Sequence, residues 1–173
     1  RVEATVVQGV GATEYPPHAE VAGLRVEQTS GCALLGNSVS GVVGSSNTGD
    51  INGPYGPYRG MDAIGLILVQ VAACTVSNNA IAKIEAGPSN KGGAQTEADD
   101  GTGSCVRISK STGIVLQHLS CNDIAPGGPT GAGGGVVILA DQAEPVDLNS
   151  SVISSVDGAC LRSETGSAAD LIA

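Results

Sequence analysis

Apolar residues along this chain fall into short stretches in which every second position is apolar, and the same stretches recur. Placing residues 24–42 over residues 66–84 aligns the apolar positions of the two segments at one offset of 42 residues. The coincident pairs are Leu24/Leu66, Val26/Leu68, Cys32/Cys74, Leu34/Val76, Asn37/Asn79, Val39/Ile81 and Val42/Ile84. So many coincidences at one offset indicate an internal repeat.

The repeat continues along the rest of the chain. An offset of 82 from the first copy brings a third copy into place: Val106, Ile108, Ile114, Leu116, Cys121 and Ile124. An offset of 114 places Ile138, Ala140, Val146, Leu148, Ile153 and Val156, and an offset of 137 places Leu161, Ser163, Ala169 and Leu171. We expect the following side chains to point into a shared core: Leu24, Val26, Leu34, Leu66, Leu68, Val76, Ile108, Leu116, Ile138 and Leu148.

The spacing within a copy predicts strands rather than helices. Apolar alternation of period two is typical of short strands with one buried face, and the Gly, Ser and Asn residues between them favour bends. Each copy has three such stretches, and a compact copy has about 23 residues. The sequence therefore predicts an all-β parallel β-helix of about five coils, with like residues stacked at about 4.8 Å. A β-sandwich with evenly spaced strands is the alternative, but it does not explain the position-by-position register.

Two segments carry a family resemblance. GLILVQVAACTVSNNAIAKI (65–84) and CVRISKSTGIVLQHLSCNDI (105–124) resemble the repeats of right-handed parallel β-helix proteins of the pectate-lyase-like superfamily. The resemblance covers nearly the whole chain and implies a right-handed coil in a single domain over residues 1–173, or a segment of a longer β-helix. The shared pattern is one of strand, bend and Asn, and it contains no catalytic signature.

The resemblance also suggests a binding face. In the related lyases, a strand face beside the loops binds acidic polysaccharide through Ca²⁺ and a catalytic Arg or Lys. Arg107 stands in an outward position of this kind and is a candidate ligand-binding residue. The equivalent residues of the other copies are Arg25, Ile67, Leu139 and Arg162. The alternative is a solvated face, on which Arg25 with Glu27 and Arg162 with Glu164 form surface ion pairs.

Extra residues between the copies are expected at one corner of the coil. The long segments 11–22, 43–62, 85–104 and 125–135 are rich in Gly, Pro, Ser and Asn. Insertions that line up in a repeat protein often form a binding face, so we take as candidate ligand-binding residues Tyr55, Tyr58 and Arg59. Candidate Ca²⁺ ligands in the same segments are Asp50, Asp62, Asp99 and Asp100, because hard cations bind carboxylate oxygens. Tolerated surface loops with solvated charge are the alternative, since no Ca²⁺ motif of fixed spacing is present.

The sequence favours a non-catalytic protein. Asp99 and Asp100 in ADDG resemble the paired carboxylates of polygalacturonases, but they lie in a Gly-rich segment that no His-Gly or Arg-x-Lys sequence follows. His18 lies in a Pro-containing loop and His118 at a predicted bend. We therefore expect no catalytic residues and no cofactor other than Ca²⁺.

Five cysteines occur without the spacing of a zinc site. Cys32 and Cys74 share an inward position in adjacent coils, where parallel side chains about 4.8 Å apart exceed the usual disulfide geometry, so reduced, buried thiols are expected. Cys105 and Cys160 would lie two coils apart, too far to pair. Asn37 and Asn79 coincide at a bend and are expected to hydrogen-bond along the coil. Ser151 takes their place in the fourth copy, and Leu119 interrupts the series.

The composition and net charge of the chain limit the classes of partner that it is expected to bind. Phe and Trp are absent and Gly occurs 26 times, which suits tight, repeated strands of small and β-branched residues. A net charge of −9 argues against nucleic acid as a partner. No apolar run is long enough for a membrane span, so no membrane insertion is expected.

These observations favour a secreted or cell-surface structural protein, either a subunit of a β-helical fibre or surface appendage or a segment of an adhesin. Leu171 falls on the position of Leu34, and Val2 and Val7 fall on the positions of Leu34 and Val39, so the two terminal coils are complementary. We therefore expect head-to-tail self-association, although a piece of a longer β-helix would show the same phase. The alternative function is a polysaccharide-binding module, or a polysaccharide lyase or hydrolase of the same superfamily.

Overall fold

The computed structural model describes residues 1–3, 5–10, 20–45, 60–89, 100–131, 133–138, 146–163 and 171–172, and the regular structure of these residues is entirely β-strand. The strands are β1 (Val2–Glu3), β2 (Val6–Gln8), β3 (Glu20–Ser30), β4 (Ala33–Leu35), β5 (Ser38–Val43), β6 (Asp62–Ser77), β7 (Ala80–Glu85), β8 (Gly103–Ser109), β9 (Thr112–Gln117), β10 (Ser120–Ala125), β11 (Gly133–Ile138), β12 (Val146–Asn149), β13 (Val152–Val156), β14 (Ala159–Ser163) and β15 (Leu171–Ile172). The described ranges include no helix long and apolar enough to span a membrane.

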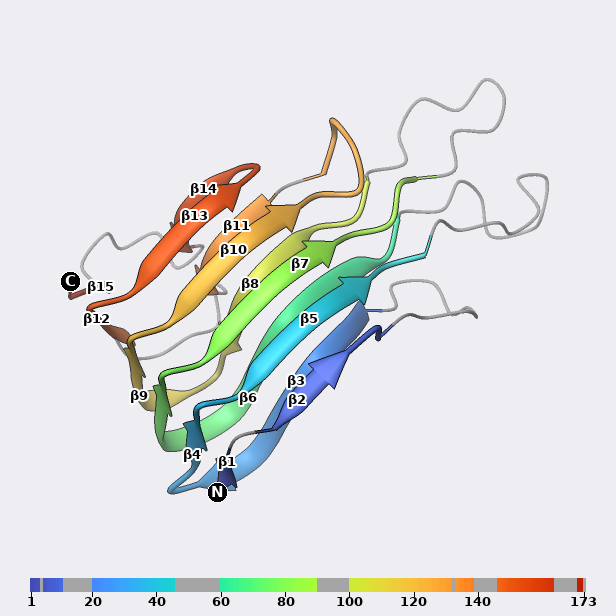
Figure 1. Ribbon diagram of the computed structural model, residues 1–173. Helices are drawn as coiled ribbons and strands as arrows, with labels where there is room; N and C mark the ends of the chain where they lie inside the picture. The colour runs from blue at the N-terminus through green and yellow to red at the C-terminus, as the bar shows by residue number, and fades with distance from the viewer. Residues whose placement is uncertain are drawn as a thin grey trace.

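Three rows of parallel strands run side by side (Figure 1). The first row contains β3, the first half of β6, β8, β11 and β14, and the second row contains β1, β4, the second half of β6, β9, β12 and β15. Because β6 belongs to both, these two rows form one ten-stranded sheet. The third row is a separate five-stranded sheet in the order β13, β10, β7, β5, β2. All strand pairs between described residues are parallel, which confirms an all-β fold with parallel strands and is unlike an antiparallel β-sandwich.

Strand pairing follows the predicted repeat. Leu24 pairs with Leu66, which pairs with Val106 in the next copy. In the third row one unbroken series runs through Val7, Val39, Ile81, Cys121 and Ile153. We call such a series a column and name it after its member in the first copy, so the last series is the Val39 column.

Two parts of the predicted register are wrong by two residues. In the fourth copy Val136, rather than Ile138, pairs with Val106. In the fifth copy Leu171 pairs with Val146, whereas the repeat predicts that it pairs with Leu148. A shift of two residues leaves the same side chains on the same face of a strand, so apolar alternation alone does not reveal it.

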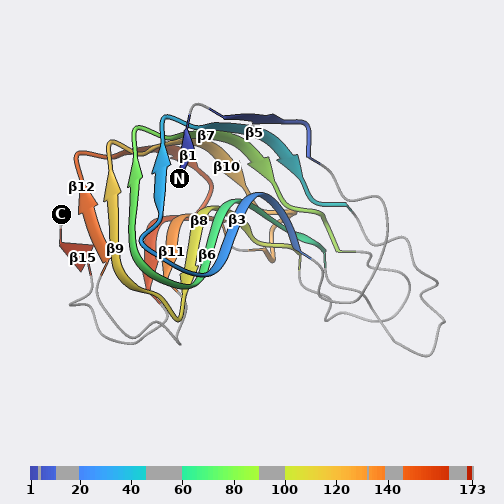
Figure 2. The same ribbon diagram turned by 90° about the horizontal axis from the view of Figure 1, so that it is seen from below.

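The core contains residues of both sheets, which face each other in Figure 2. Of the residues predicted to point inward, the following are buried: Leu34, Leu66, Leu68, Val76, Ile108, Leu116 and Leu148. Leu24 and Val26 are half-buried and pack against the core. The side chain of Ile138 lies outside the described part of the structure.

The strands bend at residues in the left-handed backbone region, and these residues also stand in columns. One column is Gly36, Asn78, His118 and Ser150, with φ of 63, 56, 48 and 47°. A second column of this kind lies in the third row and contains Gly9, Gly41, Lys83, Asp123 and Ser155, with φ between 50 and 69°. Non-glycine residues seldom adopt this conformation, and here the stacked neighbours impose it at the same place in every copy.

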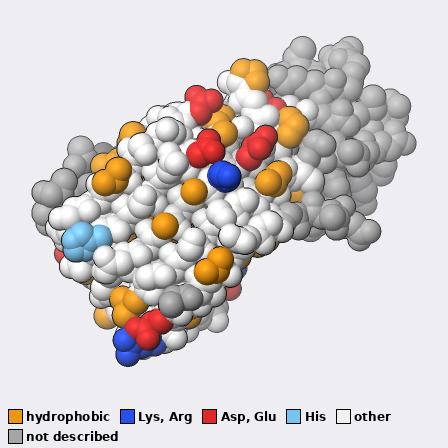
Figure 3. Space-filling view, in the orientation of Figure 1, with side chains coloured by type: hydrophobic (Ala, Val, Ile, Leu, Met, Phe, Trp, Pro, Cys, Tyr) orange, Lys and Arg blue, Asp and Glu red, His pale blue; other side chains and the backbone are white. Residues whose placement is uncertain are grey.

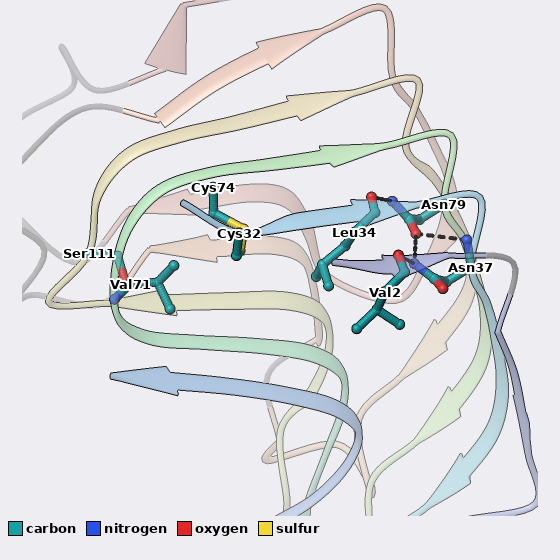
Figure 4. The surroundings of a disulfide bond; sticks show 8 residues. All are labelled: Val2, Cys32, Leu34, Asn37, Val71, Cys74, Asn79 and Ser111. Atoms are coloured by element: carbon teal, nitrogen blue, oxygen red, sulfur yellow. Dashed lines mark hydrogen bonds between the residues drawn. A yellow bond between two sulfur atoms is a disulfide. The ribbon is translucent and has the colours of Figure 1, made fainter. Parts of the chain in front are cut away.

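A hydrogen-bonded Asn ladder lies beside the first of these bends (Figure 4). Asn37 donates from its backbone N and from Nδ2 to Asn79 Oδ1, at 2.9 and 2.8 Å. Asn79 Nδ2 in turn donates to the backbone oxygen of Leu34 at 2.8 Å. In the later copies the backbone N of Leu119 donates to Ser151 Oγ at 3.1 Å. The predicted amide stacking is confirmed, and its role is to satisfy backbone groups at a buried bend.

Two disulfides contradict the expectation of reduced thiols. Cys32–Cys74 joins adjacent copies with a Cα–Cα distance of 4.5 Å (Figure 4), and Cys105–Cys121 joins the two sheets across the core at 5.9 Å. Both separations lie within the range that a disulfide spans. The expectation failed for Cys32 and Cys74 because their side chains turn toward each other rather than remain parallel. Cys160 is free and exposed, in line with the prediction that it does not pair with Cys105.

A glycine column explains where the second disulfide fits. Residues Gly23, Gly65, Cys105, Gly135 and Cys160 share this column, which we call the Gly23 column. A Cβ on Gly65 would lie 2.2 Å from Ile81 Cγ2, and one on Gly23 would lie 2.3 Å from Val39 Cγ1. The Gly23 column therefore faces the Val39 column across the core with no room for a side chain opposite a branched residue. In the third copy a cysteine pair replaces this glycine-and-branched pair.

Candidate functional site

The described stems of three insertions meet where the third row passes to the first row of the next copy. Gly87 N donates to the backbone oxygen of Met61 at 2.9 Å, Gly101 N to that of Gly87 at 2.9 Å, and Gly127 N to that of Gly101 at 3.0 Å. A Cβ on Gly87 would lie 2.0 Å from the backbone oxygen of Ser45, so the close approach of the backbones requires glycine. We call this hydrogen-bonded set, Met61, Gly87, Gly101 and Gly127, the stem seam.

Asp100 lies beside the stem seam and is 4% exposed. Its Oδ1 accepts hydrogen bonds from Ser89 N and Oγ at 2.7 and 2.8 Å. Its Oδ2 accepts from Thr130 N and Oγ1 at 3.1 and 2.7 Å. Burial by itself raises the pKa of Asp100, but these four hydrogen bonds outweigh it and hold the pKa well below its usual range. The ionised carboxylate thereby ties the stem of one insertion to that of the next.

Arg107 occupies the outer face of the first row, between Ile67 and Val137 of the adjacent copies. Val137 stands where Leu139 was expected, as a result of the two-residue shift. Arg107 Nη2 lies 3.0 Å from Asp62 Oδ2 and Nη1 lies 3.2 Å from Glu20 Oε2. The Arg107 side chain is 13% exposed, so these ion pairs are partly shielded from solvent.

Arg25 extends this group on its exposed side. It forms ion pairs with Glu20 and with Glu27, as expected for a charged strand face. The hydrogen bond to Glu20 is the main reason that the pKa of the Arg25 guanidinium is raised above its usual value. Glu20 therefore bridges two arginines. We call Glu20, Arg25, Asp62 and Arg107 the Arg107 cluster, whose formal charges cancel.

Two polar atoms on β8 are buried and have no hydrogen-bond partner among the described residues: Arg107 Nε and Ser104 Oγ. Ser104 is fully buried. A buried donor without a partner costs roughly 1–3 kcal/mol, so these two atoms reduce the stability that β8 would otherwise gain.

The structure brings together some of the predicted site residues and not others. Arg107 and Asp62 form an ion pair, whereas Asp100 accepts its hydrogen bonds from Ser89 and Thr130 beside the stem seam. The remaining candidates, Asp50, Tyr55, Tyr58, Arg59 and Asp99, lie outside the described residues. Among the described residues, no group of three or more His, Cys, Asp or Glu side chains is placed to hold a metal ion.

Sequence reasoning missed Glu20, which lies 87 residues before its partner Arg107. A signal was present, because Glu20 and Asp62 share a column and each stands five residues before a member of the Arg25 column. Glu20 pairs with Arg25 in its own copy and also reaches Arg107 in the third copy, so the two columns lie close enough for their side chains to meet.

Shallow hollows occur elsewhere on the described surface. One, of about 290 Å³, lies between Pro126 and Asp157. Another, of about 330 Å³, crosses the third row beside Lys83, Glu85 and Asp123. The third-row face in Figure 3 is covered mostly by small polar side chains and backbone, with few charged groups. Neither hollow is lined by the Arg107 cluster.

Comparisons of this chain with protein-family models, with curated proteins and with solved structures find no match.

Proposed function

We propose that this chain is a non-catalytic structural protein of the cell exterior, built as a right-handed parallel β-helix of the pectate-lyase-like type with about five coils. It forms part of a fibre, a surface appendage or an adhesin and associates head to tail. The observation that carries the proposal is the continuity of the three rows, in which strands of successive copies pair in parallel from one end of the described chain to the other. Such continuity is typical of a rigid rod.

The state of the charged residues supports a structural rather than a catalytic role. The guanidinium of Arg107 is engaged by two carboxylates. Asp100 is engaged by hydrogen bonds that bind two stems together. Groups held in this way connect neighbouring strands and stems of the rod.

Two disulfides support the extracellular location. Disulfides persist in oxidising compartments and are rare in the reducing cytosol. Cys74, Cys105 and Cys121 are fully buried, so the bonds are placed as structural cross-links.

Negative-stain microscopy and light scattering of the purified chain test the proposal. Rods that join into fibres are the expected result, and the chain is expected to leave polygalacturonate with Ca²⁺ unchanged, as followed by the absorbance of unsaturated products. Product formation that is lost in Arg107→Ala but retained in Arg25→Ala would refute the structural role.

That outcome would favour the second candidate, a polysaccharide-binding or polysaccharide-cleaving protein. The observation in its favour is the Arg107 side chain, which stands on the outer face of the first row and remains 13% exposed. Against it stands the cancellation of charge within the Arg107 cluster, which leaves little attraction for an acidic sugar.

A further inference from the structure

A glycosylation motif lies at the bend between β12 and β13. Asn149, Ser150 and Ser151 form the sequence Asn-x-Ser, in which the middle residue is not proline. This is the acceptor motif for N-linked glycans in proteins that pass through a eukaryotic secretory pathway. It occurs once in the chain. A three-residue motif also arises by chance, so the position of Asn149 in the fold decides whether a glycan fits there.

The side chain of Asn149 points outward from the second row. Its neighbour Leu148 belongs to the inward column of Leu116, and successive residues of a strand point to opposite faces. Asn149 is accordingly exposed. Ser150 follows in the left-handed region with φ of 47°, at the outer corner where the second row passes to the third (Figure 2). A glycan on Asn149 would therefore extend into solvent without displacing residues of the core.

The side-chain amide of Asn149 is also uncommitted. The other described asparagines use their side chains in hydrogen bonds: Asn37, Asn78, Asn79 and Asn122. Asn149 takes part only through its backbone oxygen, which accepts from His118 N at 3.0 Å and from Ser151 Oγ at 3.1 Å. Among the described asparagines, Asn149 is thus the one whose side chain can be modified without breaking a hydrogen bond.

We propose that Asn149 is an N-glycosylation site whose donor is an oligosaccharide carried on a polyprenyl diphosphate. In the transfer, Asn149 Nδ2 bonds to the anomeric carbon of the first sugar, and the bond from that carbon to the diphosphate oxygen breaks. The diphosphate leaves with the bonding electron pair and the amide loses one proton, so nothing is oxidised or reduced.

The inference rests on the extracellular location in the proposed function and adds a covalent modification to it. The two disulfides fit the same route, because disulfides form in the oxidising compartments of the secretory pathway.

Production of the full chain behind a signal peptide in cultured mammalian cells tests the proposal. The chain is expected to exceed its sequence mass by one oligosaccharide and to migrate more slowly on electrophoresis. Digestion with peptide N-glycosidase in water enriched in heavy oxygen is expected to restore the mobility. Peptide mass spectrometry is then expected to find a labelled aspartate at position 149.

Two variants separate the motif from the fold. Asn149→Gln keeps an exposed amide but removes the acceptor, and it is expected to abolish the mobility shift. Ser151→Thr keeps the hydroxyl of the motif and the hydrogen bond that Ser151 Oγ accepts from Leu119 N, so it is expected to retain the glycan. Asn122→Gln, at an exposed asparagine outside any such motif, is the matched control and is expected to leave the shift unchanged.

The outcomes distinguish this site from the proposed function. A disulfide-bonded chain with an unmodified Asn149 would overturn the glycosylation site and leave the structural function standing. A chain that is glycosylated at Asn149 but forms no rods would support the site and count against the fibre role. Chain retained inside the cells is assessed in the same way, because the transfer precedes secretion.

Discussion

Because the Gly23 column faces the Val39 column across the core, we predict that adding one methyl group at Gly65 disrupts the packing there. This residue has an ordinary backbone conformation, since it is not among the residues of positive φ. The variant Gly65→Ala therefore tests packing alone. Its Cβ would lie 2.2 Å from Ile81 Cγ2 and 2.8 Å from the backbone oxygen of Cys105, against a normal carbon contact of about 3.5–4.0 Å.

The expected loss in the free energy of unfolding is about 2 kcal/mol. Overpacking a dense core costs roughly 1–3 kcal/mol, and the upper part of that range applies because one of the two contacts is backbone that cannot rotate away. Replacing glycine reduces the entropy of the unfolded chain, which offsets about 0.5–1 kcal/mol. The net effect remains destabilising.

A double-mutant cycle with Ile81→Ala isolates the contact. Ile81→Ala alone leaves a cavity and is expected to cost about 2–4 kcal/mol. It also removes Cγ2 but leaves the backbone oxygen of Cys105, so Gly65→Ala is expected to cost about 1 kcal/mol less in that background than in the wild-type chain. Urea unfolding followed by circular dichroism gives the four free energies, provided that the m-values agree. Costs that add within about 0.5 kcal/mol would refute the facing of the two columns.

An engineered disulfide gives a second test of the same contact. Gly65→Cys with Ile81→Cys places cysteines in the two columns that already hold Cys105–Cys121. We expect an additional disulfide, detected as the loss of two hydrogens per chain in the intact mass. Free thiols at both positions in the folded, oxidised protein would contradict the argument.

Three further predictions concern the cross-links and the corner. Because Cys32–Cys74 closes a segment with a sequence separation of 42, Cys32→Ser with Cys74→Ser is expected to lower the free energy of unfolding by about 4 kcal/mol in urea titrations; an unchanged midpoint would contradict this. The pKa of Asp100 is depressed, so its contribution to stability is present above the ordinary carboxyl pKa of about 4 and is lost as the pH falls toward the lower folded value; unfolding of Asp100→Asn is expected to depend less on pH in this acidic range, and equal profiles would exclude the effect. Deleting Lys91–Thr96, which lie outside the described residues, is expected to change the free energy of unfolding by less than about 1 kcal/mol, because Gly87 and Gly101 are hydrogen-bonded beneath the insertion; loss of the β signal would show that the segment is structural.

Much of the strand register was predictable because residues of the same type recur at the same positions of successive copies. Pairs such as Leu24 with Leu66 and Val39 with Ile81 coincide in the sequence and pair in the structure. The exceptions arise at β11 and β15, where a shift by two residues preserves the apolar alternation. Turn geometry and the close approach of backbones decide such shifts, and the pattern of apolar residues contains no information about either.

The candidate site was less predictable. The sequence singled out Arg107 by its outward position but not the carboxylate of Glu20 that partly neutralises it, because that contact joins copies that are not adjacent. Asp62 was predicted as a candidate Ca²⁺ ligand, and its ion pair with Arg107 was not predicted. Charge pairs of this kind depend on side-chain reach across columns, which composition does not encode.

The sequence by itself determined the all-β class, the parallel repeat and the Asn37–Asn79 ladder, because each depends on residue type at a fixed spacing. Only the tertiary structure decided which cysteines bond and which carboxylates meet Arg107. Cys105 and Cys121 lie in the same copy, and their inward columns face each other only because both sheets contribute to one core. Contacts across that core depend on how two strand faces are placed in space, and no periodicity along the chain specifies that placement.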